Sequence, residues 1–382
     1  MFVIAWFGQR TKLIPEQSQR AWSIRRWFPC RMRRDYSGLR CMAVKDSETG
    51  IRSGIAAAET PANMKRLKRT DHTSKKLLVP TIFHEPWWMD ATSDGTYREA
   101  TVSMGGVVVG RLPYLLTKKF GGLKTIGQPL VTRVLGPALA TEFTGTNFPR
   151  SLKQLTIIRD LIHQLPKVSH VSFRLHDGVT DTLAFDAAGF STSVDFTVEI
   201  PPASKEVMWR QMRDKTRNVI RRAQGRLTVS EWVDPRQFLD FYEANLRERG
   251  LRNHYDQRIC LNIITECLQR KAGRLVMATD PSGNVQSANF TIWDHQKEYY
   301  FMSTRTRASM NGATSLLIWT ALQHAASKDL RFDMDGVHIN HESLPNILLL
   351  TGFGGVIRPR YLVKWSSALV QAGQNLKQLV VR

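Results

Sequence analysis

Cysteine is scarce in this chain of 382 residues, and no long apolar run occurs in it. The four cysteines, Cys30, Cys41, Cys260 and Cys267, show no Cys-x-x-Cys spacing, so they indicate neither a disulfide framework nor a zinc site. The apolar runs fall short of the roughly 20 residues that span a bilayer, and the opening segment Phe2–Phe7 is too short for a secretory signal. We therefore expect a cytoplasmic protein without a bound metal.

Acidic residues are also few relative to basic ones. Lys and Arg number 54 against 33 Asp and Glu, for a formal net charge of +21. Residues 1–76 hold 17 basic and 6 acidic side chains, which leaves 37 and 27 for residues 77–382. Because the first 76 residues also lack apolar periodicity, we expect them to be disordered or an upstream extension, dispensable for folding and catalysis. An Arg-rich targeting peptide and a nucleic-acid-binding arm are the alternatives.

Patterned sequence begins near Leu77 and predicts an α/β (α+β) fold in two domains, residues 77–202 and 203–382, separated at Pro201-Pro202. A Gly105-Gly106 turn between β-branched runs predicts a hairpin. In the first domain we further expect a helix at 152–165, a strand at 168–175, a helix at 182–188 and a strand at 192–200. In the second we expect helices at 205–224, 235–249, 256–271, 313–327 and 343–350, and strands at 227–232, 274–279, 285–293, 298–303, 331–334 and 356–365.

The two halves also resemble each other. Val171–Val179 precedes a Gly-Phe pair at 189–190, and Leu330–Val337 precedes a Gly-Phe pair at 352–353. Such self-similarity suggests two copies of one α/β unit.

The segment Ser303–Tyr361 reads as strand, glycine-containing loop, helix, strand and second glycine loop, the order expected for the acyl-donor half of an acyltransferase. A glycine just before a helix lets backbone N–H groups approach a phosphate closely, and the helix dipole adds positive charge there. The candidate donor-binding residues are Arg305, Arg307, Asn311, Gly312, Ala313 and Thr314.

The basic segment 205–226 carries eight Lys or Arg against two acids. In one continuous helix, Arg210, Arg213, Arg217 and Arg221 would share a face and attract phosphates. We take Arg213, Lys215, Arg217 and Arg221 as candidate substrate-binding residues, with a merely solvated face as an equal alternative. Trp88 is a further candidate, as a platform for sugar stacking. Packing of the first domain is the more ordinary role for that side chain.

Asp333 and Asp335 alternate on a predicted strand and therefore project to one face. Two like charges there would raise one pKa, which suits a general base that deprotonates an amine. Asp335 is the better candidate, because Asp333 has the alternatives of capping a loop or pairing with an arginine. Tyr361 is a candidate acid for the leaving group, with a core role as its alternative. His338 and His341 rank lower.

Neither a Gly-x-Ser-x-Gly elbow nor a Cys at a helix start is visible. This pattern favours direct transfer through a ternary complex over a covalent acyl-enzyme.

Four segments resemble the Fem-like branch of the GNAT acyltransferase superfamily, which includes peptidoglycan interpeptide-bridge aminoacyltransferases and polysaccharide-associated acetyltransferases. They lie at 86–90, at 110–116 with 135–137, at 214–224 and at 332–336 with 352–355. The resemblance implies tandem GNAT-type domains, an acceptor in the cleft between them and an acyl donor on the second. The chain departs from the usual phosphate-loop pattern, which Met310–Thr314 matches only loosely.

Together these features predict an N-acyltransferase that moves an acyl group from acyl-CoA to an amine on a sugar or cell-envelope precursor. An alternative in the same fold takes the acyl group from aminoacyl-tRNA. A non-catalytic nucleic-acid-binding protein would explain the charge but not the loop, helix and strand order.

Overall fold

The computed structural model describes residues 77–118, 122–143, 148–253, 255–337 and 344–373. The predictions for residues 1–76, including Cys30 and Cys41, and for His338 and His341 fall outside the described residues. The helices are α1 Pro86–Ser93, α2 Phe148–His163, α3 Leu183–Ala187, α4 Lys205–Gln211, α5 Asp214–Gln224, α6 Pro235–Glu248, α7 Gln257–Gln269, α8 Ala313–Ser327 and α9 Leu344–Leu350. The strands are β1 Arg98–Met104, β2 Val107–Lys118, β3 Lys124–Gly127, β4 Ala138–Leu139, β5 His170–Arg174, β6 Ser191–Ile200, β7 Thr228–Glu231, β8 Gly273–Thr279, β9 Val285–Trp293, β10 Lys297–Arg305, β11 Arg331–Val337 and β12 Val356–Ser366.

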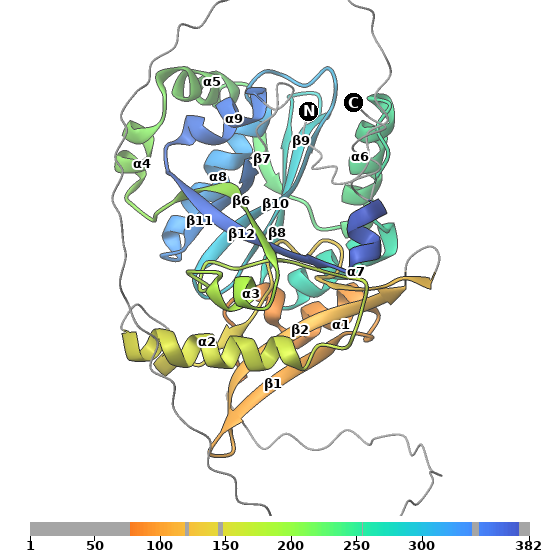
Figure 1. Ribbon diagram of the computed structural model, residues 1–382. Helices are drawn as coiled ribbons and strands as arrows, with labels where there is room; N and C mark the ends of the chain where they lie inside the picture. Colours follow the sequence, from red (N-terminus) through yellow and green to blue (C-terminus); the bar gives the residue numbers. More distant parts are fainter. Residues whose placement is uncertain (1–76, 119–121, 144–147, 254, 338–343, 374–382) are drawn as a thin grey trace, which may run out of the picture. The chain divides into compact units, whose positions relative to one another are not determined.

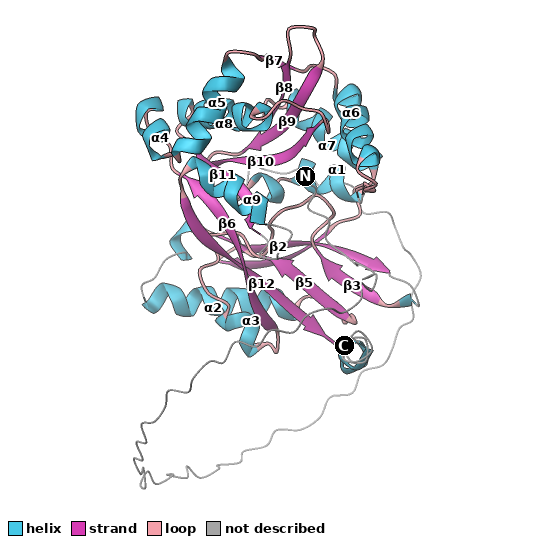
Figure 2. Ribbon diagram, turned by 90° about the horizontal axis from the view of Figure 1, so that it is seen from above, coloured by secondary structure: helices cyan, strands magenta, loops and turns pink. Residues whose placement is uncertain are grey.

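Within the described residues the strands form one mixed sheet in the order β1-β2-β3-β5-β12-β6-β11-β10-β9-β8-β7, with β4 beside β2 (Figures 1 and 2). The predicted Gly-Gly hairpin joins β1 and β2, and α8 has the predicted bounds. The α/β (α+β) fold class is thereby confirmed.

The last strand of each half crosses into the other half. Strand β12 lies between β5 and β6 and is antiparallel to both, while β6 also pairs with β11. The units β5-α3-β6 and β11-α9-β12 thus correspond to the repeated sequence pattern, and their final strands are exchanged. Because one sheet runs through both halves, the boundary at residues 202 and 203 stays a prediction.

Helices cover the sheet on both faces and define three apolar cores. Helices α5 and α8 pack on one face of the β8–β11 region, whereas α6 and α7 pack on the other, with α1 against α7 (Figure 1). Residues along β9 alternate accordingly, since Ala288, Phe290 and Ile292 point into the α6–α7 core. The third core lies under α2 and α3 (Figure 2).

The predicted helix at 205–224 is wrong as a single element. Met212 and Arg213 adopt extended backbone angles, with ψ of 149° and 144°, so α4 ends and a separate α5 begins. Met212 is buried in the core beneath α8, and the backbone N–H of Arg213 donates to the carbonyl of Gly352. Tertiary contacts therefore override a helical spacing that is continuous in the sequence.

Candidate functional site

Strands β10 and β11 are parallel neighbours that separate after a short ladder. They pair over three residues only, with Lys297–Tyr299 of β10 beside Arg331–Asp333 of β11. Beyond this point β10 stays paired with β9, and β11 stays paired with β6. Residues Tyr300–Arg305 of β10 and Met334–Val337 of β11 therefore do not pair with each other. The sheet thus opens at its centre, and the loop 306–312 leads from the end of β10 to the start of α8.

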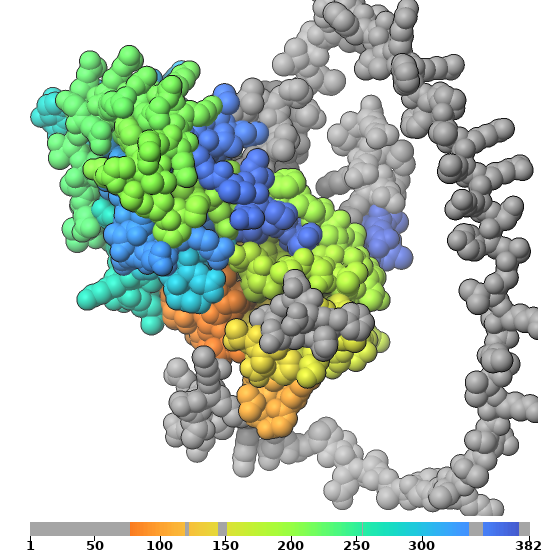
Figure 3. Space-filling model, turned by 90° about the vertical axis from the view of Figure 1, so that its left-hand side faces the viewer, coloured from red at the N-terminus to blue at the C-terminus, as the bar shows by residue number. Residues whose placement is uncertain are grey.

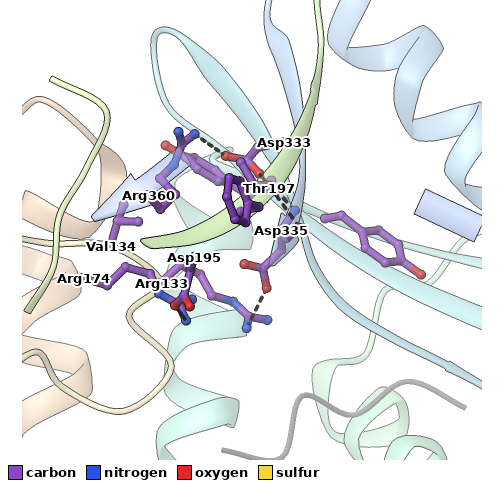
Figure 4. Close-up of a pocket in the computed structure, with 11 residues that line it drawn as sticks. Arg133, Val134, Arg174, Asp195, Thr197, Asp333, Asp335 and Arg360 are labelled. Atoms are coloured by element: carbon purple, nitrogen blue, oxygen red, sulfur yellow. Dashed lines mark hydrogen bonds and ion pairs between the residues drawn. The ribbon is translucent and has the colours of Figure 1, made fainter. Parts of the chain in front are cut away.

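A pocket opens at this separation and is lined by charged side chains from both halves (Figure 4). Its charged residues are three arginines and three aspartates, so the lining is electrically balanced. They are Arg133, Arg174, Arg360, Asp195, Asp333 and Asp335. Val134, Phe196, Thr197, Tyr299 and Tyr300 complete the wall.

Asp333 lies at the buried end of the pocket. Its carboxylate accepts hydrogen bonds from the Thr197 hydroxyl and from Arg360 Nη2, the latter at 3.2 Å, and from the backbone N–H of Asp335 at 3.0 Å. Burial raises the pKa of Asp333, while the charges of Arg360 and Lys297 oppose that rise. The expected raised pKa is present, but burial causes it, rather than a like charge on Asp335.

Asp335 adopts a left-handed backbone conformation, with φ of 62°, at an irregularity in the β11–β6 pairing. Its Oδ2 atom lies 2.8 Å from Nη1 of Arg133, and both side chains are about 15% exposed. The two aspartates line one pocket as expected, yet each faces a different arginine (Figure 4). Asp335 is the more accessible carboxylate, since Asp333 is 6% exposed.

A buried ionic cluster lies behind the pocket and joins the two halves. Lys297, at the start of β10, contacts Glu199 of β6 and lies 2.6 Å from Asp177. Arg360 of β12 contacts both Glu199 and Asp333. Burial tends to raise the pKa of Asp177, but the adjacent Lys297 outweighs it and lowers that pKa to about 2. These side chains hold the crossing strands together through paired charges.

Two predicted site residues lie elsewhere. The Trp88 ring is fully buried, edge-on to Phe83 and Phe301, and its Nε1 donates to Thr132, so its assignment as a sugar platform is wrong. Tyr361 follows Arg360 on β12 and therefore points to the opposite face, where it packs against the core under α2 and α3. The structure does not bring Tyr361 together with the aspartates.

The predicted donor residues lie at the end of β10, in the loop before α8 and in the first turn of α8. Arg305 donates to Ser309 within the loop, Thr314 contacts Ser287 of β9, and Ala313 is buried, whereas Arg307 and Asn311 are exposed. Gly312 has φ of 101°, and a Cβ there would lie 2.7 Å from the carbonyl oxygen of Val219. The close packing of α5 against this turn therefore requires a glycine at residue 312, whether or not a phosphate binds there.

The basic residues at the start of α5 and along it lie beside the loop 306–312, called the donor loop from here on, and do not line the pocket. Arg217 donates to the carbonyls of Trp209 and Arg210 at the end of α4 and pairs with Asp214. Arg221 lies over the Trp209 ring, while Arg213 and Lys215 are exposed. In Figure 3 the green surface of α4 and α5 lies against the blue segment before β12, consistent with the contact of Arg213 with Gly352. The side chains of Arg217 and Arg221 thus have partners within the protein.

Cys260 and Cys267 are free and buried, and burial raises the pKa of Cys260 to about 12. Neither thiol is therefore a thiolate nucleophile at neutral pH. Among the described residues, no group of three or more His, Cys, Asp and Glu side chains is arranged to hold a metal ion. In the same part of the chain, no helix is long and apolar enough to cross a membrane.

Sequence reasoning missed the charged partners of the two aspartates. Asp195, Thr197 and Glu199 alternate with apolar residues along β6, a pattern that ordinarily indicates a solvated face. In the structure this face meets Lys297 and Arg360 instead. The charged pair Lys297-Glu298 at the start of an otherwise apolar strand was an available signal. Arg133 lies in an irregular segment and carried no such signal.

Comparison with known proteins connects this geometry with acyl transfer. A family model described as an acetyltransferase (GNAT) domain matches residues 209–337, which contain β10, α8 and β11. No curated protein sequence matches the chain. Among solved structures, FemX is similar with a TM-score of 0.56 and 13% identity over 78% of this chain and 93% of FemX.

Two further structures show weaker similarity. L-PGS from Bacillus licheniformis has a TM-score of 0.44 and 12% identity, covering 72% of this chain and 87% of that one. A tandem GNAT protein from the clavulanic acid biosynthesis pathway has a TM-score of 0.42 and 14% identity, covering 71% and 83%. Residues 209–337 thus match an acetyltransferase (GNAT) domain, and the chain shares the fold of FemX.

Proposed function

We propose that the chain is an N-acyltransferase that moves an acyl group from acyl-CoA directly to an amine held in the pocket between β10 and β11. The observation that carries this proposal is the opening of these strands, with the donor loop at one end and two aspartates at the other. An amine on a sugar or cell-envelope precursor stays the predicted acceptor.

The donor side suits a thioester with a phosphate-bearing tail. The first N–H groups of α8 lack partners within the helix, and the helix dipole favours an anion there. The exposed Lys215 and Arg222 of α5 add positive charge beside the same turn, because Val219 and Ala223 of α5 contact Gly312. The α5 charges therefore serve the donor in this proposal, rather than an acceptor phosphate as expected from the sequence.

The acceptor side suits general-base catalysis. The lone pair of a neutral amine attacks the acyl carbon, a C–N bond forms, and the C–S bond breaks with its electron pair passing to sulfur. The amine proton passes to Asp335 and the thiolate takes up a proton, giving an amide and a free thiol. A backbone N–H on the unpaired edge of β10 can stabilise the developing oxyanion. Asp335 reaches the pocket and is more accessible than Asp333, so we assign the base to Asp335.

Aminoacyl-tRNA is the second candidate donor. The same basic turn at α5 and α8 would attract its phosphates, and the aminoacyl ester would replace the thioester. The chemistry at Asp335 would be unchanged, with an oxygen in place of sulfur as the leaving atom.

Donor binding separates these alternatives. We expect acyl-CoA to raise the melting temperature of the full chain, by an amount that grows with the logarithm of its concentration relative to Kd. An acyl thioester that lacks the CoA moiety should leave the melting temperature unchanged. Aminoacyl-tRNA is compared in parallel with deacylated tRNA. Stabilisation by duplex DNA with a steep salt dependence, without acyl transfer to any amine, would contradict the enzyme assignment and indicate nucleic-acid binding.

A further inference from the structure

Arg133 extends from the segment after β3 into the opening between β10 and β11. Its Nη2 donates to the carbonyl of Phe301 on β10 at 2.5 Å, and its Nη1 lies 2.8 Å from Oδ2 of Asp335 on β11. The guanidinium also lies over the Phe301 ring, 5.0 Å from its centroid. One side chain from the first half thus bridges the two separated strands at the point where the proposed base lies.

This bridge leaves hydrogen-bonding capacity on both partners. Among the described residues, Nε of Arg133 is buried without a hydrogen-bond partner. Oδ2 of Asp335 is close to the guanidinium but has no aligned hydrogen bond. Buried polar groups of native proteins are ordinarily satisfied, so a donor and an acceptor left open in one pocket suggest a ligand that supplies the complementary groups.

A simple amine satisfies only half of this arrangement. If the amine displaces Arg133 from Asp335, a nearly buried guanidinium loses its only carboxylate contact, since Asp335 is its one ion-pair partner among the described residues. Removal of one partner from a buried pair is strongly unfavourable. An acceptor that brings its own anion avoids that penalty and preserves the balance of three arginines and three aspartates in the lining.

We propose that the acceptor is an amine with a carboxylate one or two carbons from its nitrogen, as in a free α-amino acid. The nitrogen binds Asp335 and the carboxylate binds the Nε and Nη edge of Arg133, with which it forms paired hydrogen bonds. The short Arg133–Asp335 contact requires the two groups of the acceptor to be close together. This inference rests on the proposed function but replaces the predicted sugar or cell-envelope amine with an amino acid as the acceptor. The transfer chemistry is the one balanced above.

The test compares matched acceptors with one acyl donor and the full chain. Alanine and phenylalanine are each compared with the corresponding carboxamide and with the amine that lacks the carboxylate. We expect kcat/KM for each amino acid to exceed that for its carboxamide by at least about tenfold, because the carboxamide leaves Arg133 without a counter-charge. The amine of the carboxamide loses its proton more readily, so a preference for the amino acid is not a protonation effect.

Variants then assign the preference to Arg133. In Arg133→Gln the ratio between amino acid and carboxamide should approach one, and Arg133→Lys should retain part of it. Arg258→Gln is the matched control, since Arg258 forms an exposed ion pair with Asp94 and does not line the pocket. It should keep the wild-type ratio.

The outcomes distinguish this inference from the proposed function. Equal use of amino acids and carboxamides by the wild-type chain overturns the inference and leaves acyl transfer intact, and so does an unchanged ratio in Arg133→Gln. If Arg133→Gln does not fold, the wild-type comparison decides alone. Absence of transfer to every amine overturns both.

Discussion

His84 and His176 are buried side by side, and the N–H of Gly178 that points at Nδ1 of His176 fixes the neutral form of that ring. The Nε2 atoms contact the carbonyls of Gly136 and Pro137 and must donate to them. Nδ1 of His176 accepts from the N–H of Gly178, and Nδ1 of His84 lies 2.8 Å from the Thr81 hydroxyl. The rings meet edge-on with centroids 5.0 Å apart. Burial lowers the pKa of both groups, and their proximity lowers that of His84 further.

The lowered histidine pKa values predict loss of stability in mild acid. Because the folded pKa lies below the unfolded value near 6.5, the stabilisation is present above that pH and is lost as the pH falls toward the folded pKa. Each histidine should reduce the unfolding free energy by about 1.4 kcal/mol per pH unit in this window. Denaturant melts at several pH values measure the slope, and His176→Asn should make it shallower. The same slope in His176→Asn and in the exposed-site control His163→Asn would contradict this account.

Gly312 offers a second test at the scale of one residue. A methyl group there would lie 2.7 Å from the Val219 carbonyl oxygen and 3.1 Å from Ala223, so α5 would have to shift. Gly283 has a similar positive φ of 83° but open space around its Cβ position, which makes it a matched control for backbone strain. Gly312→Ala should therefore lose about 1–3 kcal/mol more unfolding free energy than Gly283→Ala. Equal losses of unfolding free energy in denaturant melts would show that α5 shifts to accommodate the methyl group without an energetic penalty.

At the scale of elements, Arg217 stabilises the break between α4 and α5. This side chain donates to the last carbonyls of α4 from the first turns of α5 and so ties the two helices together. Arg217→Gln should lower the unfolding free energy by about 1 kcal/mol. It should also raise the donor Kd if α5 supports the donor loop. The control Arg222→Gln, at an exposed position on the same helix, should leave stability unchanged. An Arg217→Gln chain with the unfolding free energy of the wild type would show that packing alone fixes the break between α4 and α5.

Most elements were predictable because they are local. Strands β8, β9 and β12 alternate or run apolar between turn residues, and α8 has an apolar pattern preceded by glycine. The break at Met212 was not predictable, because it depends on the distant contact of Arg213 with Gly352. The aspartates of the candidate site were recognised from the Asp-x-Asp-Gly pattern. Arg133 was not, because it lies in an irregular segment and its contacts with Phe301 and Asp335 are distant in the sequence.

At the scale of the whole described fold, the buried ionic cluster joins the halves. Lys297 is 2% exposed and is the cation that contacts both Asp177 and Glu199 most closely. Lys297→Met removes the positive charge nearest to Asp177 and Glu199 and should reduce the unfolding free energy by about 3–5 kcal/mol. Arg258→Met breaks an exposed pair and should have no measurable effect. A loss in Lys297→Met no greater than in this control would refute the structural role of the cluster.

The central claim is that Asp335 accepts the amine proton during direct acyl transfer in the pocket between β10 and β11. The most direct measurement is the single-turnover rate of transfer to an amine acceptor as a function of pH, in the wild-type chain and in Asp335→Asn. Asp335→Asn should lower the rate by about 10²–10⁴, leave the donor Kd unchanged and remove the acidic limb of the profile. Asp160→Asn, an exposed-site control on α2, should match the wild type. An Asp335→Asn chain that keeps the wild-type rate and acidic limb would contradict the assignment.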